Sequence, residues 1–277
     1  YPRPQLKREK WVNLNGMWEY SITRQDDKRA GVWDGKILVP FPIEAPLSGV
    51  ERPLEPYEAL WYRRNFNLQQ KPEGRLLLHF EAVDYQSTVL VNGKEVGGHV
   101  GGNLPFSFDI TDQVKAGRNT LILKVIDRTN MDDSFQLRGK QRLVNRGIFY
   151  TRVSGIWQTV WLEPVPESHI ESLKIDTKLN GEIRIEPSLV GKGKIRTEAW
   201  LDGQKVAEGS TVLKVDQPKL WSPDSPTLYQ LKVFMQDESG EDLDRVESYA
   251  GIREVGKIKD EDGNWRFTLN GKTIFHW

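Results

Sequence analysis

The sequence predicts an all-β protein made of two consecutive β-sandwiches. Short runs in which apolar and polar residues alternate with a period of two recur along all 277 residues. Turn-forming Asn-Gly, Asp-Gly and Ser-Gly pairs separate many of these runs. No segment shows helical periodicity over a length that would form a stable helix, so we expect strands and loops throughout.

The clearest hairpin is centred on Asn92-Gly93. The apolar run Thr88–Val91 precedes this pair, and Lys94–Val96 follows it. Both central residues of a type I′ turn need a positive φ, which Asn and Gly tolerate best. Residues 105–110 then alternate again, with Phe106, Phe108 and Ile110 on one side. This stretch predicts an antiparallel sheet with one buried and one solvated face.

We expect the first domain to span residues 1–165. Residues 1–10 contain two prolines and scattered charges, which predicts an extended lead-in rather than a helix or central strand. After the strand that ends at Ile126 comes a polar segment of roughly twenty residues, a length that is usually functional or disordered. The remaining strands are expected at 11–22, 37–40, 60–66, 76–80, 121–126 and 155–163.

Residues 166–255 are expected to form an immunoglobulin-like sandwich. Pro164 and Pro166 mark a linker before it. About seven short strands in one domain of this size are typical of that fold. We expect them at 170–179, 183–189, 195–201, 206–214, 229–236 and 248–252. Residues 256–277 predict a further hairpin around Asn270-Gly271.

The composition excludes several classes of protein. The chain has 39 basic and 39 acidic residues, so its formal net charge is zero, which argues against a nucleic-acid partner. No apolar run is long enough to span a membrane. There is no cysteine, hence no disulfide and no thiolate metal site. The sequence starts with Tyr1 and shows no signal peptide, which is typical of a mature or engineered N-terminus. Such a start is compatible with a periplasmic or secreted bacterial protein.

No motif for a metal or cofactor is present, and we expect neither. The four histidines share no spacing that suits a metal. No G-x-S-x-G motif supports a serine hydrolase, and the paired glycines at 97–98 and 101–102 precede no helix that would bind a phosphate.

One long motif resembles a known family. The order F-E-A-V-D, a strand ending in N-G, V-G-G-H, a glycine pair and P-F-S-F-D-I-T is similar to the N-terminal sugar-binding domain of glycoside hydrolase family 2. That family contains β-galactosidases, β-glucuronidases and β-mannosidases. The W-Y-R-R-N-F strand at 61–66, the strand at 155–163, P-K-L-W-S-P at 218–223 and G-I-R at 251–253 fit the same pattern. The resemblance implies a jelly-roll-like sandwich followed by an immunoglobulin-like one.

The resemblance also implies a function. This chain would be the non-catalytic N-terminal region of a retaining, β-galactosidase-like enzyme that hydrolyses O-glycosidic bonds. Such enzymes need two carboxyl groups about 5–5.5 Å apart, and in the family both glutamates lie on a (β/α)8 barrel. We therefore expect no catalytic residue here, with residues 256–277 leading to that missing barrel. The expected partners are a carbohydrate substrate and the barrel, and a homo-oligomer stays open.

Asp127 is the main candidate for substrate binding. In some family members the aspartate after the corresponding strand contacts the sugar, whereas an aspartate at a strand end also suits an ordinary turn. Neighbouring polar residues of the long loop would shape the pocket rim, namely Arg138, Arg142, Asn145 and Arg146.

Two other functions remain open. A stand-alone carbohydrate-binding module would need an exposed aromatic platform, for which Trp33, Tyr57 and Trp61 are the candidates. A purely structural or adhesive pair of sandwiches would need neither platform nor barrel, and a sandwich fold alone does not decide between these.

Overall fold

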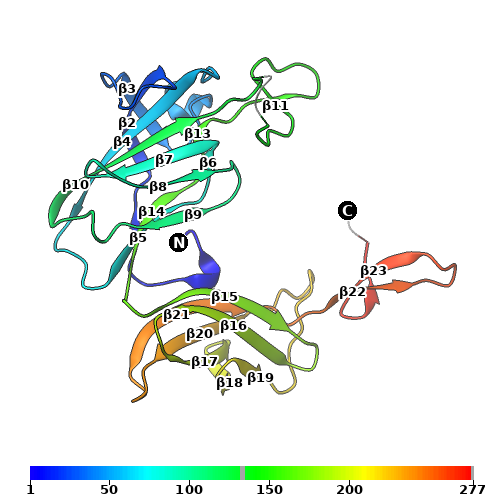
Figure 1. Cartoon of the computed structure of the whole chain (residues 1–277). Coiled ribbons are helices and arrows are strands. Elements are labelled where there is room, and N and C mark those ends of the chain that lie inside the picture. Colours follow the sequence, from blue (N-terminus) through cyan, green and yellow to red (C-terminus); the bar gives the residue numbers. More distant parts are fainter. Residues whose placement is uncertain (132–134, 276–277) are drawn as a thin grey trace. The chain divides into compact units, whose positions relative to one another are not determined.

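The computed structural model describes residues 1–131 and 135–275, and these residues form an all-β protein (Figure 1). Within them the helical elements are two single 3-10 turns, η1 (Pro4–Leu6) and η2 (Pro46–Ser48). The predicted fold class is thereby confirmed. The chain divides into two compact units, which we call the first unit (Lys10–Pro164) and the second unit (Tyr1–Glu9 with Val165–Trp277). No helix in the described residues is long and apolar enough to cross a membrane.

The first unit contains two main sheets. The six-stranded sheet has the order β3 (Gly35–Val39), β2 (Gly16–Arg24), β4 (Glu58–Leu68), β10 (Gly117–Ile126), β7 (Gln86–Val91) and β8 (Lys94–Val100). The four-stranded sheet has the order β1 (Val12–Asn13), β14 (Val160–Val165), β5 (Arg75–Phe80) and β9 (Phe106–Asp109). Two short pairs complete the unit: β6 (Val83–Asp84) with β13 (Gly155–Ile156), and β11 (Gln141–Arg142) with β12 (Tyr150–Thr151).

The turn at Asn92-Gly93 has the predicted conformation. It joins β7 to β8, and φ is 51° at Asn92 and 82° at Gly93, as a type I′ turn requires. Asn92 also accepts a hydrogen bond from the backbone N–H of Thr120 at 2.9 Å, so the turn is tied to β10. Local turn chemistry and sheet pairing therefore agree at this hairpin.

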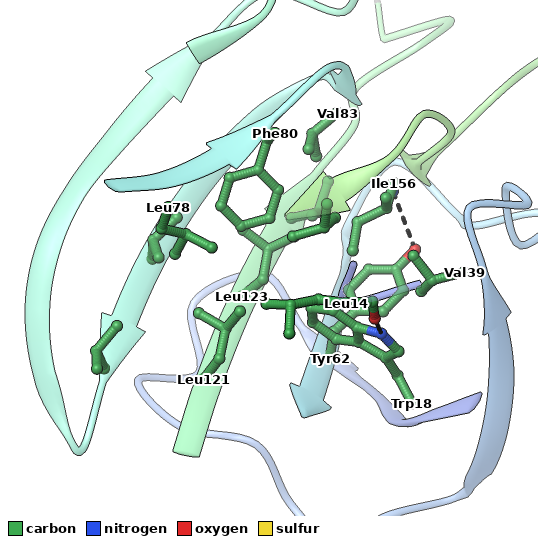
Figure 2. Close-up of a cluster of buried hydrophobic side chains, with 14 of the residues drawn as sticks. Leu14, Trp18, Val39, Tyr62, Leu78, Phe80, Val83, Leu121, Leu123 and Ile156 are labelled. Carbon is green, nitrogen blue, oxygen red and sulfur yellow. Dashed lines mark hydrogen bonds between the residues drawn. The ribbon is translucent and has the colours of Figure 1, made fainter. Parts of the chain in front are cut away.

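The core of the first unit lies between its two main sheets (Figure 2). Leu78 and Phe80 come from the four-stranded sheet, and Tyr62 and Leu123 come from the six-stranded one. The Tyr62 hydroxyl lies deep in this core and accepts a hydrogen bond from the Ile156 N–H at 3.2 Å. Burial raises the pKa of this phenol, so Tyr62 stays neutral. The hydroxyl that Tyr62 brings into this core is thus hydrogen-bonded.

The second unit is also a sandwich. Its four-stranded sheet has the order β18 (Gln204–Gly209), β17 (Lys194–Leu201), β20 (Tyr229–Gln236) and β21 (Asp242–Ala250). Its three-stranded sheet has the order β15 (His169–Thr177), β16 (Glu182–Val190) and β19 (Val212–Lys214). A separate apolar core fills the space between these sheets and includes Ile183, Leu213 and Val233. A last three-stranded antiparallel sheet follows, with the order β22 (Val255–Lys259), β23 (Trp265–Leu269) and β24 (Lys272–Thr273).

The first nine residues differ from the prediction. We expected residues 1–10 to lead into the first sandwich, but Tyr1–Glu9 belong to the second unit. Leu6 is buried in the core of that unit, and Lys7 forms an isolated bridge with Glu247. Arg8 is 6% exposed and its guanidinium Nη2 lies 2.7 Å from Oδ2 of Asp244. The ion pair and the buried leucine therefore fix this segment to β21.

Two strands of the second unit also differ from the predicted ones. The run expected at 206–214 divides into β18 and β19, which belong to different sheets. Gly209 lies at the crossing, where a Cβ atom would come within 2.4 Å of the Val212 carbonyl oxygen. The strand expected at 248–252 begins earlier, at Asp242. Buried Asp244 and Ser248 interrupt its apolar period, which concealed the beginning of the strand.

Candidate functional site

The segment 128–154, which follows β10 and which we call the candidate segment, forms the candidate site. The chain leaves β10 at Ile126 and returns through β12 and β13, and in Figure 1 the part that carries β11 extends beyond the strands of the sandwich. Three buried carboxylates and one buried arginine lie at the base of this segment. We call them the carboxylate cluster; its members are Glu44, Asp84, Asp127 and Arg152.

Asp127 holds both ends of the long segment. Its side chain is fully buried. Oδ1 accepts hydrogen bonds from the backbone N–H of Thr129 at 2.9 Å and from the Gln136 amide at 2.7 Å. Oδ2 accepts the Ser154 hydroxyl at 2.7 Å. The bond to the N–H two residues on is the local turn that Asp favours at a strand end.

Arg152 is the counter-ion of the cluster. Its side chain is fully buried, and Nη2 lies 3.1 Å from Oδ2 of Asp127. Nε donates to the Ser154 hydroxyl at 3.0 Å and lies 3.7 Å from Oε1 of Glu44. Among the described residues, Nη1 has no hydrogen-bond partner. One guanidinium therefore balances more than one buried carboxylate.

Glu44 connects the cluster to the proline-rich loop that precedes β4. Its Oε2 accepts the Ser154 backbone N–H at 2.9 Å. Burial raises the pKa of Glu44, and the hydrogen bonds from Ser154 and the charge of Arg152 oppose this shift. The proline-rich loop is thus fastened to the backbone at Ser154, where the candidate segment ends.

Asp84 titrates near neutral pH. Burial, and then the charge of Asp127, raise the pKa of Asp84 to about 7, against a hydrogen bond from Gln141 and the charge of Arg152. Gly102 faces this carboxylate so closely that a Cβ there would lie 2.6 Å from Oδ2. Gln141 also accepts the Val153 N–H at 2.6 Å, so one side chain joins β11 to the strand end and to Asp84.

The arrangement of the cluster favours positioning over chemistry. Its three carboxylates accept hydrogen bonds from Gln136, Gln141 and Ser154, which all belong to the segment 128–154. Among the described residues, no group of three or more side chains of the types that bind metals could hold an ion. The cluster can therefore fix the path of the segment and the direction of its exposed side chains.

The residues predicted to bind substrate lie in different surroundings. The Asp127 carboxylate is enclosed, whereas Asn145 and Arg146 are exposed and Arg138 and Arg142 are half-buried. The Arg142 guanidinium lies 4.2 Å from the centre of the Phe149 ring, and the Asn145 amide donates to the Thr151 hydroxyl at 3.1 Å.

The structure brings Arg142 and Asn145 together beside β12. In the described part of the chain, no hydrogen bond or ion pair joins either of them to Asp127. Contact between Asp127 and a sugar stays a prediction. The structure adds that Asp127 organises the loop on which the other four residues lie.

Sequence reasoning missed four residues of this site, Glu44, Asp84, Gln141 and Arg152. Asp84 is the last residue of the short strand β6, and Asp127 comes directly after β10, so a position at a strand end was the available signal. Glu44 and Arg152 lie in loops without a pattern that predicts burial. Their pairing depends on three segments meeting in space, which a single sequence does not show.

The three aromatic residues proposed to stack on a sugar differ in their exposure. Trp61 is 3% exposed; its indole donates to the Thr23 hydroxyl at 3.0 Å, and the Lys124 ammonium lies 5.1 Å from its ring. The Arg63 guanidinium covers Trp33 at 4.4 Å. Tyr57 is 62% exposed. A flat aromatic platform is thus not formed by the two tryptophans.

Comparison with family models gives two matches. Residues 12–166 match the sugar binding domain of the glycosyl hydrolases family 2. Residues 168–253 match a second model of the glycosyl hydrolases family 2.

Curated relatives carry the names of glycosidases. The chain is 31% identical over 234 residues to a putative β-glucuronidase of Formosa agariphila, covering 77% of this chain and 27% of that protein. It is 33% identical over 238 residues to a β-galactosidase of Thermoanaerobacter pseudethanolicus, covering 77% of this chain and 30% of that protein. The chain thus spans about a third or less of these two relatives.

Solved structures share the fold. A β-glucuronidase from Ruminococcus gnavus, in complex with a C6-substituted uronic isofagomine, superposes with a TM-score of 0.80 at 21% identity. The match covers 98% of this chain and 49% of that one. At this identity the likeness shows the fold alone.

Proposed function

The chain belongs to glycosyl hydrolase family 2, and from this premise we propose that it serves as the non-catalytic N-terminal region of a retaining, β-galactosidase-like glycoside hydrolase. In this role the first unit packs on a catalytic (β/α)8 barrel and walls its active site. The substrate is a carbohydrate with a β-glycosidic bond.

The observation that carries this proposal is that the buried carboxylate cluster fixes the segment 128–154. A surface loop of this length usually has high mobility or a function. Here four buried charged side chains fix it, at a substantial desolvation cost. Its exposed apolar side chains suit a surface that another domain covers; they include Phe135, Leu137 and Ile148.

The catalytic residues of this proposal lie outside the chain. The described residues contain no α-helix, so no (β/α)8 barrel is present among them. Asp127 is enclosed and Asp84 faces Gly102 and Gln141, so neither carboxylate faces a second one across an open pocket.

An assay of hydrolysis tests this proposal. The purified 277-residue chain is incubated with aryl β-galactosides, β-glucuronides and β-mannosides. We expect no release of the aryl group above a heat-killed control. Turnover that survives purification to homogeneity would place a catalytic pair within this chain and overturn the proposal.

A stand-alone carbohydrate-binding module is the alternative function. It needs a free aromatic surface, and Trp61 and Trp33 are both covered by cations. Binding of neutral galactan by the chain, lost on substitution of Tyr57 by Ala, would support this alternative. Association with a second copy stays a prediction, which light scattering after gel filtration checks.

A further inference from the structure

Residues 135–151 carry an excess of positive charge in a chain whose net charge is zero. We call them the cationic segment. They include four basic residues and no carboxylate; the basic residues are Arg138, Lys140, Arg142 and Arg146. Asp132 and Asp133 precede the segment and lie outside the described residues. The local charge is therefore positive on any count of residues 128–151, which contain five basic and two acidic residues.

The charges of the cationic segment are not used inside the protein. Within residues 1–131 and 135–275, none of its four basic side chains forms an ion pair with a carboxylate. Arg142 donates from Nη1 to the Gln141 carbonyl oxygen at 2.7 Å, and its second contact is the Gly139 carbonyl oxygen at 3.4 Å. Both acceptors are neutral, so the positive charge remains available to a ligand.

Aromatic rings accompany these cations. The Arg142 guanidinium lies 4.2 Å from the centre of the Phe149 ring, and the Lys140 ammonium lies 6.0 Å from that of Tyr150. Tyr150 is 64% exposed. Stacking on a ring restrains an arginine without neutralising it. The segment thus presents oriented positive groups next to accessible ring surface.

The backbone of the cationic segment is fixed in advance. Strands β11 and β12 pair in parallel, with Gln141 opposite Tyr150. The Tyr150 N–H donates to the Lys140 carbonyl oxygen at 3.0 Å, and the Leu143 N–H donates to Asn130 at 2.8 Å. The carboxylate cluster holds the same segment from below through Gln141. A ligand that fits this spacing need not order the loop, which lowers the entropic cost of binding.

We propose that the cationic segment binds an acidic glycan, a saccharide whose carboxylate or sulfate groups meet the arginines while its rings lie against Tyr150. Arginine suits both groups because its planar fork of donors matches their oxygens. A nucleic acid fits less well, since its binding depends on neutralising many phosphates and the remainder of the chain has no basic excess. The placement of the cationic segment beside the bond to be cleaved rests on the proposed function. The binding of an acidic glycan does not rest on it.

Affinity electrophoresis of the 277-residue chain tests this binding. Native gels contain polygalacturonate, a sulfated galactan, a neutral galactan or polyglutamate. We expect the two acidic glycans to retard the chain at low ionic strength and the retardation to decrease with salt, because exposed charges are screened within about 10 Å at 0.1 M. Retardation by only one acidic glycan identifies carboxylate or sulfate as the group that is bound.

Two double variants locate the site. The variant R142Q/R146Q removes two cations of the segment, and K257Q/K259Q removes two lysines that flank the Trp265 ring at 4.8 and 5.4 Å. We expect the first to raise the dissociation constant by about tenfold, or 1.4 kcal/mol, and the second to leave it unchanged. Because Arg142 is half-buried, the exposed single variant R146E provides a check in which folding is not at risk.

Three results would overturn the inference. The first is equal mobility of the chain in acidic and neutral glycan gels. The second is retardation by polyglutamate as strong as by the glycans, which would show attraction to any polyanion. The third is unchanged binding in R142Q/R146Q and R146E. None of these bears on hydrolysis, so failure of this inference and failure of the proposed function are distinguishable.

Discussion

The Ser154 hydroxyl donates a 2.7 Å hydrogen bond to Oδ2 of Asp127, across 27 residues of sequence. This bond joins the point where the candidate segment leaves the sandwich to the point where it returns. Both side chains are buried, and Arg152 contacts both of them. The long loop therefore begins and ends at one fixed place.

Substitution of Asp127 by Ala should destabilise the first unit. It leaves the Arg152 guanidinium without its nearest counter-ion in a buried place, and breaking such a pair costs about 3–5 kcal/mol. Urea unfolding followed by tryptophan fluorescence measures the change. Substitution of the exposed Asp112 by Ala is the control, with an expected change within about 0.5 kcal/mol. Equal stability of the two variants would contradict a buried role of Asp127.

Stability should depend on the protonation of Asp84. The pKa of Asp84 in the folded protein is raised to about 7, from an ordinary value of 3.8. The stabilising effect of its protonated form is complete below about pH 4. This effect is lost as the pH rises through 7, where the buried side chain must ionise beside Asp127.

The variant D84N removes this titration and keeps an oxygen that accepts from Gln141. We expect D84N to be more stable than the parent at pH 8, by on the order of 3 kcal/mol, and about equal to it at pH 4. Thermal unfolding at a series of pH values gives the comparison. A difference that stays constant from pH 4 to pH 8 would show that Asp84 does not titrate in this range.

Gly155 should tolerate no side chain. Its φ is +82°, and an added Cβ would lie 2.0 Å from the Tyr62 hydroxyl oxygen. Gly49 has a similar φ of +79° with nothing within 4 Å of the added atom. Substitution of each by Ala separates the two effects. We expect G155A to cost about 1–3 kcal/mol more than G49A, the range of overpacking in a core; equal costs in urea unfolding would show that the clash relaxes.

Several elements followed from the sequence because their information is local. Alternation placed strands such as β5 and β10, and Asn92-Gly93 fixed a hairpin through the φ values that only such residues adopt readily. The family motifs led to the two sandwiches. Each of these signals lies within one continuous stretch of sequence.

The features that the sequence did not predict depend on contacts between segments that are distant in sequence. The partner of Arg8 is Asp244, 236 positions away, and nothing near Arg8 indicates it. The carboxylate cluster likewise joins Glu44 to Ser154, 110 positions apart. A buried carboxylate looks like a solvated one until its partners are known, so the sequence did not reveal the cluster.

The first nine residues should stabilise the second unit. Arg8 and Asp244 form a nearly buried ion pair, and Arg8 Nη2 also donates to the Ile170 carbonyl oxygen at 2.6 Å. Substitution of Arg8 by Ala leaves the Asp244 charge buried, so we expect a loss of about 3–5 kcal/mol. Arg245 to Ala, at an exposed neighbouring position, is the control. A similar urea midpoint for both variants would show that the segment contributes little.

The reading frame beyond Trp277 gives the most direct test of the central claim. If this chain is the non-catalytic region of a family 2 glycoside hydrolase, sequencing past that codon should reveal about 250 or more further residues with alternating strands and helices, the length of a (β/α)8 barrel. Two carboxylate residues at the ends of barrel strands should follow within them. A stop codon close to residue 277 would contradict the claim and favour a protein that acts by binding alone.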